Sequence, residues 1–139
     1  MVVRNDQQVI QRLLTTLGRW AVVGLSQNRA RRAYDVSAYL QQGLGQEIVP
    51  VHPRAEEVHG QQGYARLADI PGRVDVVDIF VNAHLAGDVV DEAIAIGAGA
   101  VWLQLGVIDD PAALRAAAAG LEVVMDTCPA IEGPALGLG

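Results

Sequence analysis

Positive charge is scarce in this chain and takes only one form. The 139 residues contain no lysine. All ten cationic side chains are arginines, and they face sixteen acidic residues, so the formal net charge is −6. This balance argues against a non-specific nucleic-acid-binding protein, which needs a basic surface. We therefore predict no nucleic-acid partner, and the places where arginines gather become informative.

Cysteine and long apolar runs are also nearly missing. Cys128 is the only cysteine, which excludes an intramolecular disulfide and predicts a reducing, cytoplasmic location. A lone cysteine beside Pro129 favours packing over reactivity. No apolar run approaches the roughly 18 residues of a membrane span, and no basic region precedes an apolar core at the N-terminus. We expect neither a membrane partner nor a signal peptide.

Apolar runs alternate along the chain with segments of helical periodicity. This alternation predicts a parallel sheet with right-handed crossovers. The length and the 51% hydrophobic content suit one domain over residues 1–139 with a sizeable core. The predicted fold class is α/β: a Rossmann-like, doubly wound, mostly parallel sheet of five to six strands in three α/β/α layers. The expected strand order is 3-2-1-4-5-6.

The boundaries follow from periodicity and from capping residues. Strands are predicted at 20–24, 47–51, 74–81, 100–105 and 121–125, with a short edge strand at 62–64. Helices are predicted at 5–17, 34–42, 83–96 and from Asp110-Pro111 to Gly120, with one helical turn at 65–70. The first of these lies within an N-terminal helical segment, residues 1–18. Residues 126–139 are predicted to form a C-terminal turn and tail.

Capping and turn residues are predicted as well. Asn5 with Gln8 fits a capping box, and Asn82 and Asp110 are expected as N-caps. Asp75 and Asp78 flank a strand and are expected to serve solubility or a turn.

The richest segment follows the first predicted strand. Ligands of open parallel sheets lie outside the carboxyl ends of the strands, where the strand order reverses. A strand, a tight polar turn and a helix start suit phosphate binding, and arginines match phosphate oxygens in a bidentate fork. A solvated loop with capping side chains is the alternative. The candidate residues here are Gly24, Leu25, Ser26, Asn28, Arg29, Arg31 and Arg32.

The end of the second strand distinguishes between nucleotides. An NAD site usually has an acidic residue there, whereas this chain has His52, Pro53 and Arg54. The first turn also lacks the second and third glycines of GxGxxG. Both features disfavour NAD, and a basic residue suits a phosphorylated ribose, as in NADP or coenzyme A.

Little in the sequence suggests catalysis. The three histidines show no metal-ligand spacing, and no Ser-His-Asp set can be assembled. We predict no catalytic or metal-binding residues and favour a binding module over an enzyme.

Several segments, in order and spacing, resemble one protein family. The sequence is similar to the small stand-alone CoA-binding proteins of bacteria, which look like the nucleotide-binding domain of the succinyl-CoA synthetase alpha subunit without its second domain. The resemblance runs from about Trp20 to Glu132. The matching segments are 23–26, Tyr34 with 39–40, 48–53, Gly60 with Tyr64, 74–80, 92–97, 101–106, and 124–126 with Cys128.

The resemblance implies binding of coenzyme A or an acyl-CoA without ligase activity. It implies that the turn 24–32 holds the pyrophosphate and that 52–54 lie by the adenosine and its 3′-phosphate. It further implies that Phe80 and Val81 border the adenine and that Gln104 lines the pantetheine side.

The chain departs from the family at one point. Family members often have two arginines after the residue matching Phe80, where this chain has Val81 and Asn82. Either Arg29, Arg31 and Arg32 compensate for the missing arginines, or the affinity for CoA is weaker, or the ligand is a different molecule.

Two other functions remain open at this stage. One is an NADP-binding oxidoreductase-like domain, and the other is a regulatory or scaffold subunit that has lost its ligand. The expected partner is a small-molecule nucleotide. The apolar tail 135–139 and the first helix leave a homo-oligomer open.

Overall fold

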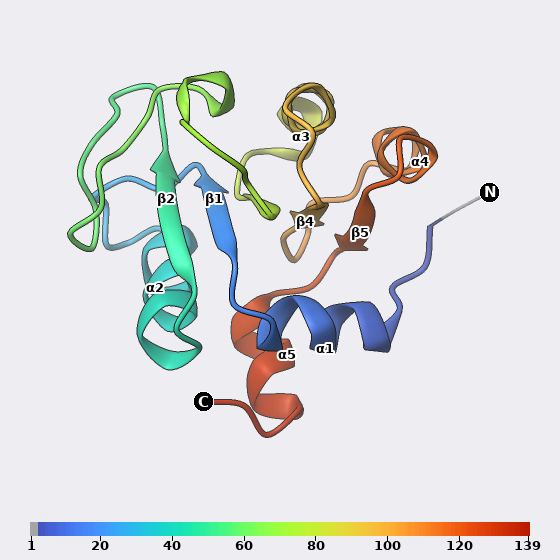
Figure 1. The fold of residues 1–139 in the computed structure, drawn as a ribbon, viewed down its shortest axis with the longest axis horizontal. Helices are drawn as coiled ribbons and strands as arrows, with labels where there is room; N and C mark the ends of the chain where they lie inside the picture. Colours follow the sequence, from blue (N-terminus) through green and yellow to red (C-terminus); the bar gives the residue numbers. More distant parts are fainter. Residues whose placement is uncertain (1–2) are drawn as a thin grey trace.

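Five parallel strands form one sheet with helices on both faces (Figure 1). The computed structural model describes residues 3–139, so Met1 and Val2 of the predicted domain lie outside the described residues. The strand order is β2-β1-β3-β4-β5. The strands are β1 (Arg19–Val23), β2 (Glu47–Val51), β3 (Val76–Ile79), β4 (Ala100–Leu103) and β5 (Glu122–Met125).

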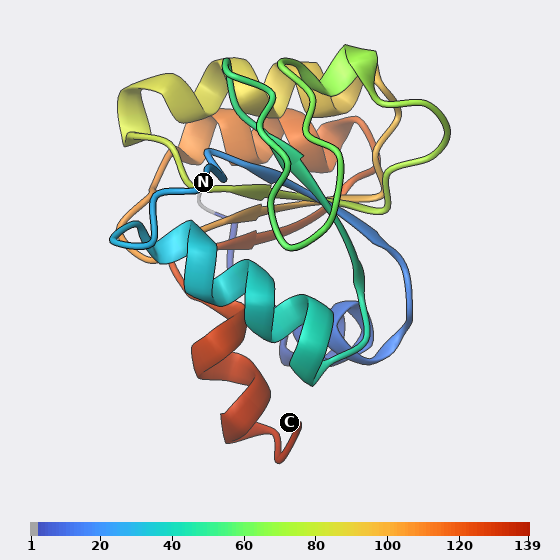
Figure 2. The ribbon, with the colours of Figure 1, turned by 90° about the vertical axis from the view of Figure 1, so that its left-hand side faces the viewer.

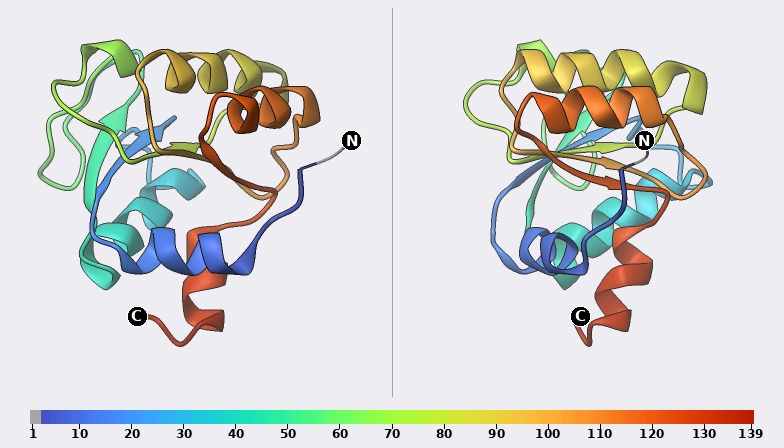
Figure 3. Two further views of the ribbon diagram at one scale, coloured as in Figure 1. Left: turned by 45° about the vertical axis from the view of Figure 1, so that its right-hand side comes forward. Right: turned by 90° about the vertical axis from the view of Figure 1, so that its right-hand side faces the viewer.

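The helices lie in two layers, with α3 and α4 on one face of the sheet and α1, α2 and α5 on the other (Figures 2 and 3). None of the helices in the described part of the chain is long and apolar enough to span a membrane. The helices are α1 (Gln7–Thr15), α2 (Arg32–Ala38), the π-helix η1 (Tyr39–Gly43), the 3-10 helix η2 (Leu67–Asp69), α3 (Ala83–Ala95), α4 (Asp110–Ala118) and α5 (Pro129–Ala135).

Each face of the sheet has its own core. Side chains alternate along a strand, so Val77 packs towards α3 and α4 while Val76 packs towards α1 and α2. The second core contains the fully buried pair Trp20 and Trp102, whose ring centroids lie 5.7 Å apart. Burial on both faces explains the near-continuous apolar runs of the strands. The predicted Rossmann-like α/β fold is confirmed.

The predicted sixth strand is present only as a single bridge. Tyr64 pairs in parallel with Val51 of β2, its N–H donates to the Pro50 carbonyl, and its carbonyl accepts from His52 N–H. Counting this bridge, the order matches the expected 3-2-1-4-5-6. Pro50 faces the outer edge and has no N–H to donate, so the pairing cannot extend into a ladder.

Two predicted N-caps were wrong by one residue. Asp6, not Asn5, caps α1 by accepting from Gln8 N–H at 2.8 Å. The Asn5 amide instead bonds both the N–H and the carbonyl of Met125 in β5, at 2.9 and 2.8 Å. In α4 the cap is Asp109, which accepts from Ala112 N–H, while Asp110 is already helical.

The Asn82 prediction is right in position only. Asn82 precedes α3, but its side chain makes no capping hydrogen bond.

The predicted C-terminal tail contains a helix. In α5, Gly133 packs against the Tyr39 side chain, and a Cβ at this position would overlap the Tyr39 hydroxyl. That hydroxyl donates to the Leu138 carbonyl at 3.1 Å, and desolvation raises the pKa of Tyr39. Cys128 precedes α5 and is fully buried, which raises the pKa of its thiol. The glycines and prolines of this segment led to the prediction of a turn and tail. Pro129, however, stands in the first turn of the helix, where proline is tolerated.

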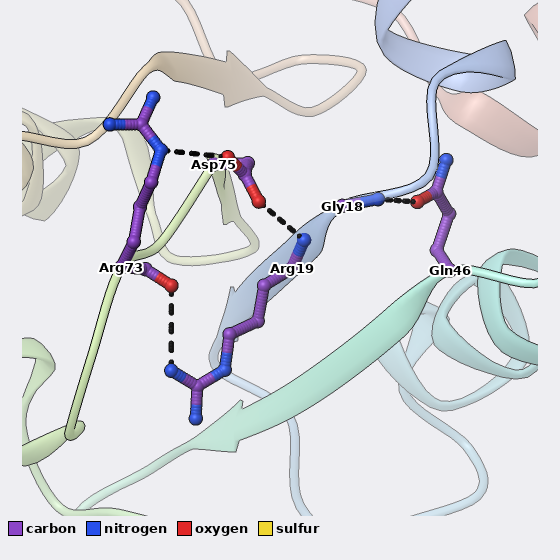
Figure 4. Close-up of polar contacts among 5 residues, drawn as sticks. All are labelled: Gly18, Arg19, Gln46, Arg73 and Asp75. Atoms are coloured by element: carbon purple, nitrogen blue, oxygen red, sulfur yellow. Dashed lines mark hydrogen bonds and ion pairs between the residues drawn. The ribbon is translucent and has the colours of Figure 1, made fainter.

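Side-chain hydrogen bonds close the amino end of the sheet (Figure 4). Gln46 is 2% exposed, and its amide donates to the carbonyls of Leu13, Leu14 and Thr16. Its Oε1 accepts from Gly18 N–H at 2.8 Å. Gln46 therefore satisfies carbonyls that the end of α1 leaves without helical partners.

Two arginines at the same end are paired with acids. Asp75 accepts from Arg19 N–H at 2.8 Å through Oδ2 and from Arg73 Nε at 2.9 Å through Oδ1. Arg19 Nε lies 2.5 Å from Glu47 Oε2. The charges at the amino end of β1 thus balance one another within the protein.

Candidate functional site

A cavity of about 750 Å³ opens over the carboxyl ends of β1, β2 and β3. A volume of this size suits a small-molecule ligand. The loops after β1 and β2, the end of β3, the segment before η2 and one face of α3 form its walls. β1 pairs with β2 on one side and with β3 on the other, so the cavity lies where the strand order reverses.

Most of the predicted site residues line this cavity. They come from three strand ends that are far apart in the sequence, and parallel pairing brings these ends together. The predicted residues in the cavity wall are Gly24, Ser26, Asn28, Arg31, His52, Pro53, Arg54, Phe80, Val81 and Asn82.

Four predicted residues lie elsewhere. Leu25 is fully buried in the core beneath α2. The Arg29 guanidinium lies 5.5 Å from the centre of the Tyr34 ring. Arg32 is the first residue of α2 and is not part of the cavity wall. Gln104 is 3% exposed and donates to Asp78 below the strand ends.

The loop after β1 is held by its own polar side chains. Gly24 has φ +99°, and a Cβ there would lie 3.0 Å from the Phe80 carbonyl oxygen, so only glycine fits. Ser26 Oγ accepts from Asn28 N–H, and Asn28 Oδ1 accepts from Ala30 N–H. Ser26 and Asn28 therefore stabilise the loop itself and do not cap α2.

Gln27, which the sequence did not single out, ties this loop to the loop after β2. Its backbone N–H donates to Glu56 Oε1 at 3.1 Å, and its side-chain amide donates to the Glu57 carbonyl at 2.8 Å. Two walls of the cavity are thus fixed relative to each other.

The arginines of the cavity wall lack acidic partners. Arg31, Arg54 and Arg66 all line the cavity, and none forms an ion pair within residues 3–139. Beside them, His52 Nδ1 accepts from Arg54 N–H at 3.2 Å, which orients the imidazole ring. The cavity therefore offers guanidinium groups to an anionic ligand.

One face of α3 supplies further cavity residues that sequence reasoning missed. Leu85, Asp88, Val89 and Glu92 recur at helical spacing and line the wall opposite the loops. That spacing is visible in the sequence, but only the fold shows which helix face borders the strand ends. Arg66 follows an irregular segment, and no sequence signal would have found it.

A buried acid–amide pair lies below the carboxyl ends of β3 and β4. The Gln104 amide donates to Oδ1 of Asp78, which is fully buried. Burial raises the pKa of Asp78 to about 8, and the hydrogen bond from Gln104 only partly opposes this. The prediction of a solubility or turn residue was wrong, because β3 is a central strand with both faces covered.

The family assignment follows from comparison with known proteins. Residues 18–134 match the family described as "CoA binding domain". The chain belongs to the CoA binding domain family. The match covers the strands, all three loops of the cavity and α3.

Two proteins of uncharacterized function are similar over most of this chain. The chain is 33% identical over 119 residues to the uncharacterized protein YneT of Bacillus subtilis, covering 86% of this chain and 87% of that protein. A hypothetical protein from Pyrococcus horikoshii OT3 superimposes with a TM-score of 0.88 at 36% identity, covering 95% of this chain and 92% of the other.

A larger protein is similar over a shorter stretch. The alpha subunit of an ADP-forming acetate–CoA ligase from Pyrococcus furiosus is 38% identical over 61 residues, which are 44% of this chain and 13% of that subunit.

Proposed function

We propose that this chain binds coenzyme A or an acyl-CoA in the cavity over β1, β2 and β3. The observation that carries the proposal is the group of unpaired arginines in the cavity wall, Arg31, Arg54 and Arg66. Coenzyme A carries a diphosphate and a 3′-phosphate, and guanidinium groups bind such oxygens in charge-assisted pairs. Membership of the CoA binding domain family supports the same ligand.

The three phosphates are assigned to the two loops that Gln27 ties together. Gly24 allows a ligand to approach the backbone after β1, and Arg31 at the end of that loop neutralises the diphosphate. Arg54 and His52 after β2 take the 3′-phosphate. Phe80 and Val81 at the end of β3 offer apolar surface to the base.

Arg66 compensates for the arginines that other family members often have after the residue matching Phe80. Val81 and Asn82 occupy those positions here, and Arg66 brings a third cation to the cavity from the segment before η2. The cavity itself remains open at about 750 Å³. Both observations favour a retained ligand over a subunit that has lost it.

Binding is proposed without ligation. The Pyrococcus furiosus relative is named a ligase subunit, but the aligned stretch is 13% of its length. Arg54 would also suit the 2′-phosphate of NADP, so the family match, and not the cavity alone, favours coenzyme A over an NADP-dependent oxidoreductase.

Titration calorimetry tests the proposal directly. CoA, acetyl-CoA, 3′-dephospho-CoA, NADP and NAD are titrated into the purified protein. CoA and acetyl-CoA are expected to bind tightest. Loss of the 3′-phosphate should weaken binding by about ten-fold or more, because Arg54 loses a charged partner. Equal affinity for NAD and CoA contradicts the proposal, and tighter binding of NADP supports the oxidoreductase-like alternative.

Mass spectrometry gives an independent test. Nucleotides released by heating the freshly purified protein are identified, and CoA or an acyl-CoA is expected among them. This measurement also names the acyl group.

A further inference from the structure

The wall of the cavity formed by α3 differs in charge from the walls formed by the loops. The loops after β1 and β2 contribute Arg31, Arg54 and Glu56, whose carboxylate is already hydrogen-bonded within the loops, whereas Asp88 and Glu92 are the charged residues that α3 contributes. Carboxylates repel phosphate oxygens. The phosphates of a nucleotide therefore belong on the loop walls, and an uncharged part of the ligand belongs against α3.

The surface between these charges is apolar. Leu67 of η2 and Val89 of α3 are buried there, at 1% and 8% exposure. Leu85, one helical turn before Val89 in the cavity wall, remains 45% exposed although it is a large apolar side chain. A flat aromatic ring placed against this surface would cover Leu85, and burial of that area would favour binding.

The two acids have acceptor oxygens free for a ligand. Neither Asp88 nor Glu92 forms an ion pair within residues 3–139, in contrast to Asp91 of the same helix, which binds Arg115 at 3.0 Å. Asp88 also lies near enough to Arg115 to contribute to the raised pKa of that guanidinium. Glu92 follows Leu85 by seven residues, so it lies on the same helix face and is the better placed acceptor.

We propose that α3 recognises an adenine base, with Leu85 and Val89 against the ring and Glu92, assisted by Asp88, accepting hydrogen bonds from the exocyclic 6-amino group. This inference rests on the proposed function. The 6-amino group offers two N–H donors, which carboxylates accept. Guanine presents an oxygen acceptor at that position, so it cannot donate to these carboxylates from the same place. The acidic wall thus favours an amino group at position 6 of the base, while the basic walls bind the phosphates.

The test compares CoA with 1,N6-etheno-CoA, in which the 6-amino nitrogen is part of a fused ring and its donors are lost. Both ligands carry the same phosphates, so the ratio of their dissociation constants is insensitive to the overall charge of the protein. The wild-type protein is expected to prefer CoA by about five- to ten-fold, the worth of one or two partly exposed hydrogen bonds to a charged acceptor.

Two variants locate the preference. Asp88→Ala/Glu92→Met removes both carboxylates from α3. It should weaken CoA binding by about the same five- to ten-fold and leave etheno-CoA unchanged, so that the preference disappears. Asp91→Asn is the matched control, since it removes a carboxylate of the same helix that lies away from the cavity. This variant should prefer CoA over etheno-CoA as strongly as the wild type does. Thermal unfolding confirms that each variant is folded.

The outcomes separate this inference from the proposed function. A preference for CoA that survives in Asp88→Ala/Glu92→Met overturns base recognition by α3, as does equal binding of both ligands by the wild type. In either case tight CoA binding still stands. If CoA does not bind to the wild-type protein, the proposed function fails and this inference fails with it.

Discussion

The two ends of the sheet use their arginines in opposite ways. At the amino end, Arg19 Nε lies 2.5 Å from Glu47 Oε2. Arg73 donates to Asp75 at the same end (Figure 4). At the carboxyl end, Arg31 and Arg54 line an open cavity and form no ion pair within the described residues 3–139. Arginines that bind acids of their own chain hold the fold together. Arginines without such partners are available to an anionic ligand.

The comparison extends to the uncharged polar groups. Gln46 at the amino end uses its donor and its acceptor on backbone groups of the α1–β1 connection. Ser26 and Asn28 at the carboxyl end also bond to backbone, but within one loop, where they fix its shape. Polar side chains preorganise both ends, whereas unpaired arginines line the cavity at the carboxyl end.

The largest effect is expected from removing charge at the carboxyl end. Arg31→Ala/Arg54→Ala should weaken CoA binding by about 2–4 kcal/mol, because two charge-assisted contacts to phosphate are lost. The thermal midpoint should hardly change, since neither guanidinium forms an ion pair with any of residues 3–139. Calorimetry and thermal unfolding measure the two quantities. Arg12→Ala, which breaks the ion pair with Glu122 away from the cavity, is the control. An unchanged CoA affinity in the double variant would place both arginines in solvent.

The reverse pattern is expected at the amino end. Gln46→Met should lower the free energy of unfolding by about 2–3 kcal/mol, because buried backbone groups of the α1–β1 connection lose their partner. The affinity for CoA should stay within about two-fold of the wild type. Urea unfolding and calorimetry provide the measurements, and Gln42→Met, at an exposed position, is the control. A large loss of affinity would show that the two ends are coupled.

A smaller, pH-dependent effect is expected from the buried acid below the cavity. The folded state raises the pKa of Asp78 from 3.8 to about 8, so it binds a proton that the unfolded chain has already released. The free energy of unfolding therefore falls as the pH rises from about 4 to about 8, and this contribution levels off above that. Asp78→Asn, which mimics the neutral acid, should stabilise the protein by about 2 kcal/mol at pH 7 and flatten this slope.

Urea titrations at a series of pH values test the role of Asp78. The exposed Asp69→Asn variant serves as a control and should keep the wild-type slope. If Asp78→Asn keeps it too, Asp78 is ionised in the folded protein.

The smallest effect concerns the arginine that points away from the cavity. Arg29→Ala should change the CoA affinity by less than about 0.5 kcal/mol, because its guanidinium lies over Tyr34 and not in the cavity wall. The measurement is the same calorimetric titration. A loss as large as that of the double variant would mean that the loop rearranges on binding and brings Arg29 to the ligand.

The fold could be predicted from the sequence wherever one pattern had a single interpretation. The run 47–51 matches β2 to the residue, and the stripe of 83–96 matches α3 within one residue. Helix starts were harder, because Asn5 and Asp6 are both good caps, as are Asp109 and Asp110. Only tertiary contacts, such as the bonds of Asn5 to Met125, decide between neighbours.

The candidate site was predictable where it consists of strand ends. Val23, Val51 and Ile79 end adjacent parallel strands, so the residues that follow them had to meet. Arg66 and Glu92 come from an irregular segment and from a helix face, whose approach to the strand ends depends on packing. The burial of Asp78 likewise depends on the central position of β3.

The two edge strands of the sheet, β2 and β5, have a consequence for self-association. An exposed edge strand is a template for intermolecular pairing and aggregation. Here the Asn5 amide occupies both hydrogen-bonding groups of Met125 in β5. On the opposite edge, Tyr64 covers β2 at Pro50, which has no donor to offer. A strand from a second copy could pair with either edge only after displacing Asn5 or Tyr64. Any assembly of this protein is therefore expected to form through helices or loops.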